Sequence, residues 1–279
     1  MENEIQNDIQ TETHTEAKTT RCLNCDTVFE GDFCPKCGQS AETGRFTFKF
    51  IWENLLSALF GKDGGIWLTF KSLFTQPGKM ILENLNGKRK RYFSPFPLLL
   101  FTLTLFILVY SFTGSRDYVK AAETVAERSK NGGDQIKYVA QKTIADALNF
   151  YNNNYTLCYL LTLPLLAFSA RKCFGKQNRN RYNWAEYIII LVYASVFIIL
   201  YRILGSLAYL ASPDVSHKMT LFLPLVTIIA LTACFKKVMG FGTINTLLRS
   251  ILTYVLYSLM LISLGFIAIV IITLCQTGL

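Results

Sequence analysis

Hydrophobic positions fall in long blocks that begin only after Pro97, whereas the preceding residues are mixed and polar. A bilayer core of about 30 Å needs about 20 apolar residues per helix. Five blocks are candidate spans: residues 97–112, 155–170, 187–210, 219–235 and 251–275. The third and fifth reach this length alone, the first and second need their flanks, and the fourth contains Pro224 and is expected to be kinked or partial. The pattern predicts an all-α integral membrane helical bundle over residues 93–279.

Residues 46–92 carry a different pattern, in which apolar side chains recur at helical spacing. One face of the stretch from Phe48 to Leu59 is apolar, and a second apolar segment, 66–74, ends before Pro77-Gly78. Such faces are typical of cytoplasmic interfacial amphipathic helices. The same faces can instead pack on the membrane bundle, and the pattern leaves both readings open.

Two further segments are polar. Residues 113–150 contain two helical stretches separated by Asn131-Gly132-Gly133, which predicts an outer helical loop. Residues 1–20 are acidic and Thr-rich without an apolar core, so we expect a disordered tail and no cleavable signal peptide.

Composition supports the membrane assignment, because 51% of the residues are hydrophobic and only 17% are charged, against about 25% in soluble domains. The net charge of +9 admits nucleic acid or an anionic membrane as partner. The basic residues lie beside the apolar blocks, which favours the lipid bilayer and membrane topology. With the N-terminus in the cytoplasm, the inner flanks hold 12 Lys and Arg residues and the outer segments hold seven. This excess predicts a cytoplasmic N-terminus.

Residues 21–40 carry the strongest motif, a pair of C-x-x-C sequences formed by Cys22, Cys25, Cys34 and Cys37. Two such knuckles present four thiolates to one metal ion, so the spacing predicts a small N-terminal zinc-ribbon module with structural Zn²⁺. Gly38 suits the tight turn after the second knuckle, and Asp26 occupies the same place in the first. A redox dithiol or disulfides are the alternatives, and both are poorly suited to the cytoplasmic side.

The charge of the ribbon indicates its kind of partner. Asp26, Glu30 and Asp32 stand against Lys36 alone between Cys22 and Gln39. Phosphate backbones need positive charge, so we expect no nucleic acid. A cytoplasmic protein contact or a purely structural cap fits this charge better.

Inside the predicted spans the chain offers little chemistry. Arg202 lies 18 residues after Trp184, about 27 Å along a helix, which places it near the outer interface where its side chain can reach water. Glu186 lies at the inner edge, and His14 and His217 lie outside the spans. No nucleophile-elbow or nucleotide-binding motif is present, so we expect no enzyme.

Several motifs occur in a characteristic order: the ribbon, then Gly64-Gly65-Ile66-Trp67-Leu68-Thr69, Gln76-Pro77-Gly78, and Asn86-Gly87-Lys88-Arg89-Lys90-Arg91-Tyr92 with Pro95. In this order they resemble the bacterial membrane proteins of domain-of-unknown-function family 3667. The resemblance is specific over residues 22–100 and implies a bacterial inner-membrane protein with an N-terminal ribbon. It implies no activity.

Three functions remain. The first is a non-enzymatic scaffold or regulatory protein whose ribbon contacts a cytoplasmic protein. The second is a transporter or channel for a small or lipid-like solute, since several spans carry Ser, Thr and Tyr. The third is a membrane enzyme acting on lipid or envelope precursors. The sequence indicates no oligomeric state.

Overall fold

The computed structural model describes residues 19–48, 65–113, 117–131, 135–178 and 181–277. The first 18 residues of the predicted tail, and the predicted amphipathic stretch after Phe48, lie outside this part of the chain. Two short antiparallel strands come first, β1 (Thr20–Arg21) and β2 (Val28–Phe29). Helices follow: α2 (Ile66–Thr75), α3 (Pro77–Leu85), α4 (Pro95–Thr113), α5 (Asp117–Asn131), α6 (Gln135–Asn153), α7 (Tyr155–Asn178), α8 (Trp184–Ala211), α9 (Pro213–Met239) and α10 (Thr243–Thr277).

Five of these helices are long and apolar enough to cross a membrane, which confirms the predicted fold class. Their apolar parts are Pro95–Thr113, Tyr155–Gly175, Trp184–Ala211, Pro213–Met239 and Thr243–Ile272. Each is longer than the block read from the sequence, because a helix continues into the interface beyond the hydrocarbon core. Pro224 does not interrupt α9, which runs through 27 residues. This helix is long enough to cross a membrane, and the kink expected at Pro224 stays a prediction.

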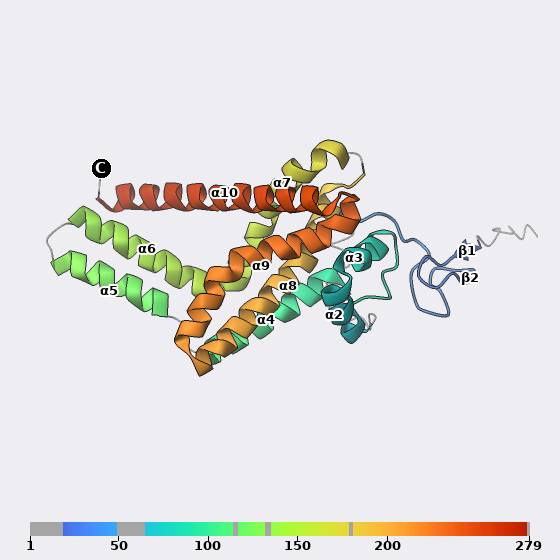
Figure 1. Cartoon of the computed structure of the whole chain (residues 1–279), viewed down its shortest axis with the longest axis horizontal. Coiled ribbons are helices and arrows are strands. Elements are labelled where there is room, and N and C mark those ends of the chain that lie inside the picture. Colours follow the sequence, from blue (N-terminus) through green and yellow to red (C-terminus); the bar gives the residue numbers. More distant parts are fainter. Residues whose placement is uncertain (1–18, 49–64, 114–116, 132–134, 179–180, 278–279) are drawn as a thin grey trace, which may run out of the picture.

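The core of the bundle lies around α8, which packs against α4, α7 and α9 (Figure 1). Consecutive residues of α8 from Ile189 to Ala194 are fully buried. A helix that is apolar on all sides and buried on all sides must be central. By contrast, none of the most apolar window of α10 is buried. In a bilayer this uncovered apolar surface meets lipid chains.

Helix α3 packs on the ribbon-side end of α9, with Met80 and Ile81 almost completely buried. Gly78 makes this crossing possible, because a Cβ there would lie 2.8 Å from the Cβ of Lys237 and 3.1 Å from the carbonyl oxygen of Ala233. For α3, the structure thus favours packing on the bundle over an isolated interfacial helix. Helix α2 still presents Trp67 with 80% of its surface exposed.

The polar segment after α4 forms two helices, α5 and α6, which lie antiparallel against each other and approach α10 (Figure 1). They project from the end of the bundle opposite to the strands β1 and β2. We call the end that carries the strands the ribbon end, and the end that carries α5 and α6 the distal end. Chemistry-bearing residues gather at both ends.

Candidate metal centre and its docking site

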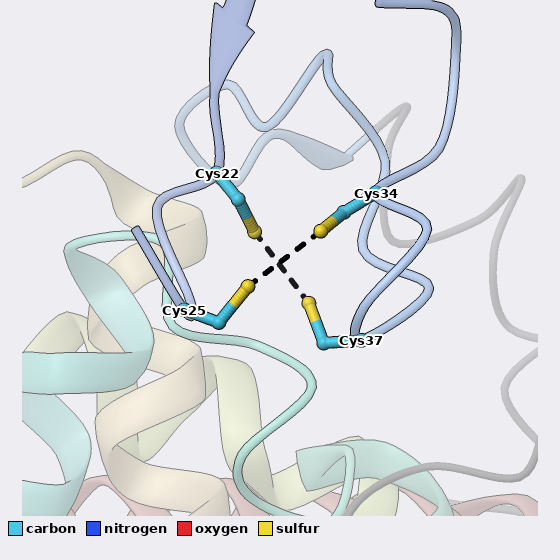
Figure 2. Close-up of side chains that lie close together, drawn as sticks. All are labelled: Cys22, Cys25, Cys34 and Cys37. Atoms are coloured by element: carbon cyan, nitrogen blue, oxygen red, sulfur yellow. Dashed lines mark hydrogen bonds between the residues drawn. The ribbon is translucent and has the colours of Figure 1, made fainter. Parts of the chain in front are cut away.

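The four predicted ligands come together at the ribbon end. The sulfur atoms of Cys22, Cys25, Cys34 and Cys37 all lie within 4.8 Å of one another and point at a common centre (Figure 2). The Cys22–Cys37 and Cys25–Cys34 pairs are each 3.5 Å apart. Four sulfurs at about 2.3 Å from a zinc ion form a tetrahedron with edges of about 3.8 Å, and a disulfide would need about 2.05 Å. The arrangement fits a tetrahedral metal ion and not a disulfide.

The two knuckles have matching backbone geometry, which explains why they converge. In each, the first cysteine carbonyl accepts from the amide four residues later, at 2.9 Å from Asp26 and 2.8 Å from Gly38. Asp26 and Gly38 both adopt left-handed φ angles, of 61° and 70°. This conformation closes the turn in the places where the sequence indicated it, and Asp tolerates it better than most residues other than Gly.

The thiols differ in their electrostatic surroundings. The Thr27 hydroxyl, 3.3 Å from the Cys25 sulfur, and the Thr27 backbone lower the pKa of Cys25 to about 6. Burial raises the pKa of Cys22 to about 12, although the backbone N–H groups of Cys25 and Asn24 point at its sulfur. A cation at the centre of the cluster would stabilise all four thiolates. The donor set and the inward-pointing amides therefore suit a metal site.

The ribbon is docked on the bundle through Gln39, whose side chain is 3% exposed. The Gln39 Nε2 donates to the Gly87 carbonyl at 2.9 Å, and its Oε1 accepts from the Arg89 backbone amide at 3.2 Å. Gly87 has a φ angle of 100°, and a Cβ there would lie 2.7 Å from the Cδ1 of Leu23. The Asn86-to-Tyr92 motif thus forms the seat of the ribbon, and this seat requires a residue without a side chain.

A second contact ties the segment after the ribbon to the start of α8. Arg45 donates to both carboxylate oxygens of Glu186, at 2.8 Å from Nε and 2.5 Å from Nη2. The Glu186 side chain is 4% exposed and the Arg45 side chain 57%. Glu186 and Asn183 also form a reciprocal capping box at the α8 N-terminus. The hydrogen bonds to Glu186 raise the pKa of Arg45 further, so Arg45 stays protonated at physiological pH.

Aromatic packing completes the contact. The Phe46 side chain is 5% exposed, and its ring centroid lies 3.9 Å from the guanidinium carbon of Arg89. The Arg89 Nη2 donates to the Gly44 carbonyl. Burial lowers the pKa of Arg89 to about 10, so it stays charged. The Asn183 amide reaches the Phe46 carbonyl at 2.8 Å. The segment 39–46 therefore fixes the ribbon to the bundle instead of acting as a loose linker.

Sequence reasoning found the four cysteines and Glu186, but it missed Gln39, Arg45 and Phe46. The Asn183-x-x-Glu186 capping box is a local signal that could have been read. No local signal exists for the Arg45–Glu186 pair, whose members are separated by 141 positions. Arg202 lies away from this site, half-buried at the distal end, where its guanidinium packs on the rings of Phe106 and Tyr155.

Comparison with known proteins gives a family match over one segment of the chain. Residues 63–107 match the family described as Protein of unknown function (DUF3667), which confirms the resemblance drawn from the sequence over this segment. The match runs from the residues before α2 through α3 and into α4. No curated protein and no solved structure matches the chain.

Proposed function

We propose that this chain is a non-enzymatic scaffold or regulatory protein of the bacterial inner membrane, whose cytoplasmic zinc ribbon binds a partner protein. The observation that carries the proposal is the asymmetry of the docked ribbon. Gln39 is 3% exposed against the Gly87 segment, whereas Val28 and Phe33 remain 65% and 66% exposed. Large apolar side chains left uncovered on a rigid module are typical of a protein contact.

Zinc is the metal that the donor set favours. Four thiolates are soft ligands that select Zn²⁺ or an iron centre, and four ligands leave no open position for a substrate. A two-knuckle module has almost no core of its own, since Cys22, Phe29 and Cys34 are its buried cluster. Metal binding is therefore expected to supply its folding free energy. This supports a structural and not a catalytic role.

The cytoplasmic orientation is supported by the charges at the ribbon end. Basic residues gather there on three segments: Lys79 and Lys88 to Arg91 after α2, Lys236 and Lys237 at the end of α9, and Arg249 near the start of α10. Basic flanks stay on the cytoplasmic side of bacterial membranes. Between Cys22 and Gln39 the ribbon carries three acidic residues and one lysine, a charge that disfavours binding to a phosphate backbone.

The proposal is tested by crosslinking in cells followed by mass spectrometry. A Val28→Ser/Phe33→Ser variant should retain its metal and its membrane level but lose the crosslinked partner. The matched control is Glu30→Ser, an exposed polar change on the same ribbon, which should retain the partner. A Cys34→Ser variant should lose both metal and partner. An identical set of crosslinked proteins for the wild type and the Val28→Ser/Phe33→Ser variant would refute the recruitment role.

The alternative is a transporter or channel for a small or lipid-like solute. One observation favours it, a cavity of about 410 Å³ between helices at the distal end, lined by Tyr201, Ser206 and other polar residues. Flux measurements in proteoliposomes distinguish the two functions. A ribbon variant such as Cys34→Ser should leave flux unchanged if transport is the activity.

A further inference from the structure

The distal end contains a cavity that the ribbon function does not use. Helices α4, α6, α8 and α9 enclose about 410 Å³, and a second cavity of about 170 Å³ lies beside it. Arg202 lines both cavities, together with Phe106, Tyr110 and Tyr151. Leu148 and Tyr151 belong to the C-terminal part of α6, so this helix forms part of the wall. This gives the outer loop a role in building a site.

The guanidinium of Arg202 makes cation–π contacts with aromatic rings instead of an ion pair with a carboxylate among the described residues. Its guanidinium carbon lies 5.3 Å from the Phe106 ring centroid and 5.2 Å from that of Tyr155. Such contacts contribute about 0.5–2 kcal/mol each, less than a buried counter-ion provides. Among the described residues that line either cavity, none is acidic. An arginine stays protonated in proteins, so both cavities carry a positive charge that an anion can neutralise.

The remaining polar groups of the cavity are suited to an oxyanion. Ser206, Ser216 and Thr220 contribute hydroxyl groups to its lining, and His217 stands at its edge. Hydroxyls and a guanidinium donate to phosphate oxygens, and the planar guanidinium matches phosphate geometry. The lining therefore combines one fixed cation with several neutral donors.

Counted from Trp184 at the opposite interface, Arg202 lies close to the distal boundary of the hydrocarbon core, from which its long side chain can reach phospholipid headgroups. It lies 18 residues beyond Trp184, about 27 Å along α8, against a hydrocarbon core of about 30 Å. Exposed apolar side chains continue from the cavity along α9, where Leu221, Phe222 and Leu225 flank the cavity residue Leu223. An acyl chain can follow this surface while its headgroup occupies the cavity. The geometry thus accepts a charged head and an apolar tail.

We propose that Arg202 and the surrounding hydroxyls bind the phosphate group of a ligand that enters at the distal membrane surface, either a lipid headgroup or a soluble phosphate compound. The phosphate contacts the guanidinium of Arg202, and the neutral hydroxyls complete its hydrogen bonds. This inference is independent of whether the ribbon recruits a partner protein.

The test uses the purified full-length protein in a nonionic detergent and three probes. These are dihexanoyl phosphatidylglycerol, the same diacylglycerol without the phosphate, and inorganic phosphate. Binding is measured by titration calorimetry, and thermal unfolding shows that each variant is folded. Arg202→Gln removes the charge, Arg202→Lys retains it, and Lys218→Gln removes a neighbouring exposed charge that does not line the cavity.

We expect the phosphatidylglycerol to bind the wild type and Lys218→Gln equally, and Arg202→Gln about tenfold or more weakly. The affinity of Arg202→Lys should lie between those of the wild type and Arg202→Gln. Binding of inorganic phosphate that displaces the lipid and depends on Arg202 would identify a soluble phosphate as ligand, and its failure to bind would identify a lipid. Equal affinity of the wild type and Arg202→Gln would overturn the proposal. So would diacylglycerol binding as tightly as the phospholipid, or a folded Arg202→Lys as weak as Arg202→Gln.

Discussion

The charged residues near the two ends of α8, Glu186 and Arg202, differ in the kind of partner that they have. At the ribbon end, the buried carboxylate of Glu186 is bound by both nitrogens of Arg45 and by the Asn183 backbone amide. At the distal end, Arg202 lies among aromatic rings, and no acidic residue is among the described residues lining its cavities. A charge that is neutralised within the chain holds the structure together. A charge that contacts only aromatic rings and a neutral tyrosine hydroxyl among the described residues can still bind an anionic ligand.

The largest expected effect is at the metal centre, because the ribbon end depends on it. Cys34→Ser should lower the bound metal from about one ion per chain to about none, since one lost thiolate opens the coordination sphere. Residues 19–46 should become sensitive to protease while the helical bundle stays inserted. Elemental analysis and limited proteolysis measure the two effects. Cys275→Ser, an exposed cysteine far from the cluster, is the matched control and should change neither.

The second prediction tests the two arginines directly. Arg45→Ala leaves the buried Glu186 without its charge partner and should lower the free energy of unfolding by about 2–3 kcal/mol. This is less than for a fully buried pair, because Arg45 is half exposed. Arg202→Gln loses two cation–π contacts but also removes a half-buried charge that faces no acidic residue among the described residues lining its cavities. These effects oppose each other, so stability should change by less than about 1 kcal/mol. Thermal unfolding of the two purified variants measures the difference. Equal destabilisation would show that the two ends are not distinct.

The third prediction tests whether the ribbon is held rigidly on the bundle through Gly87. Gly87→Ala forces a side chain into a left-handed conformation and against Leu23, which should cost about 1–3 kcal/mol and release the ribbon. Gly44→Ala is the control, since a Cβ there meets nothing within 4 Å. Hydrogen exchange of residues 39–46 should accelerate only in Gly87→Ala. Unchanged protection in that variant would contradict the docking through Gly87.

The smallest effects come from two tyrosine hydroxyls, one at each end. Tyr182 donates at 2.9 Å to the carbonyl of Val238, which lies in the last turn of α9 and has no helical partner of its own. Tyr201 donates at 2.8 Å to the carbonyl of Met219, which lies inside α9 and already accepts a helical bond. Tyr182→Phe should therefore lower the free energy of unfolding by about 1 kcal/mol, and Tyr201→Phe should lower it by less. The reverse order in thermal unfolding would argue against this account.

The sequence predicted the features that depend on local chemistry. Cysteine spacing defined the cluster, because two C-x-x-C knuckles have few ways to present four sulfurs to one point. Apolar block length predicted the five long helices, because solvent and lipid act on each segment independently. The positions of Gly38 and Asp26 indicated the knuckle turns for the same local reason. For Pro224 the sequence left a kinked or a partial span open, and the structure has one helix of 27 residues that contains this proline.

Contacts between segments that are distant along the chain could not be predicted from the sequence. Arg45 and Glu186 are separated by 141 positions, and Gln39 and Gly87 by 48. The choice between an interfacial and a packed α3 depended on whether α9 offered a surface that Gly78 could approach. Hydropathy predicted a position near the outer interface for Arg202, but the direction of its side chain depends on where α4 and α7 bring Phe106 and Tyr155.

The sequence by itself therefore determined the membrane-spanning helices and the four-cysteine cluster, since each follows from side-chain chemistry within one segment. Only the tertiary structure decided that the ribbon docks on Gly87, that the segment after it binds Glu186, and that Arg202 faces a cavity. Both depend on which helices pack side by side, and packing is set by the shape of the whole bundle and not by any one segment.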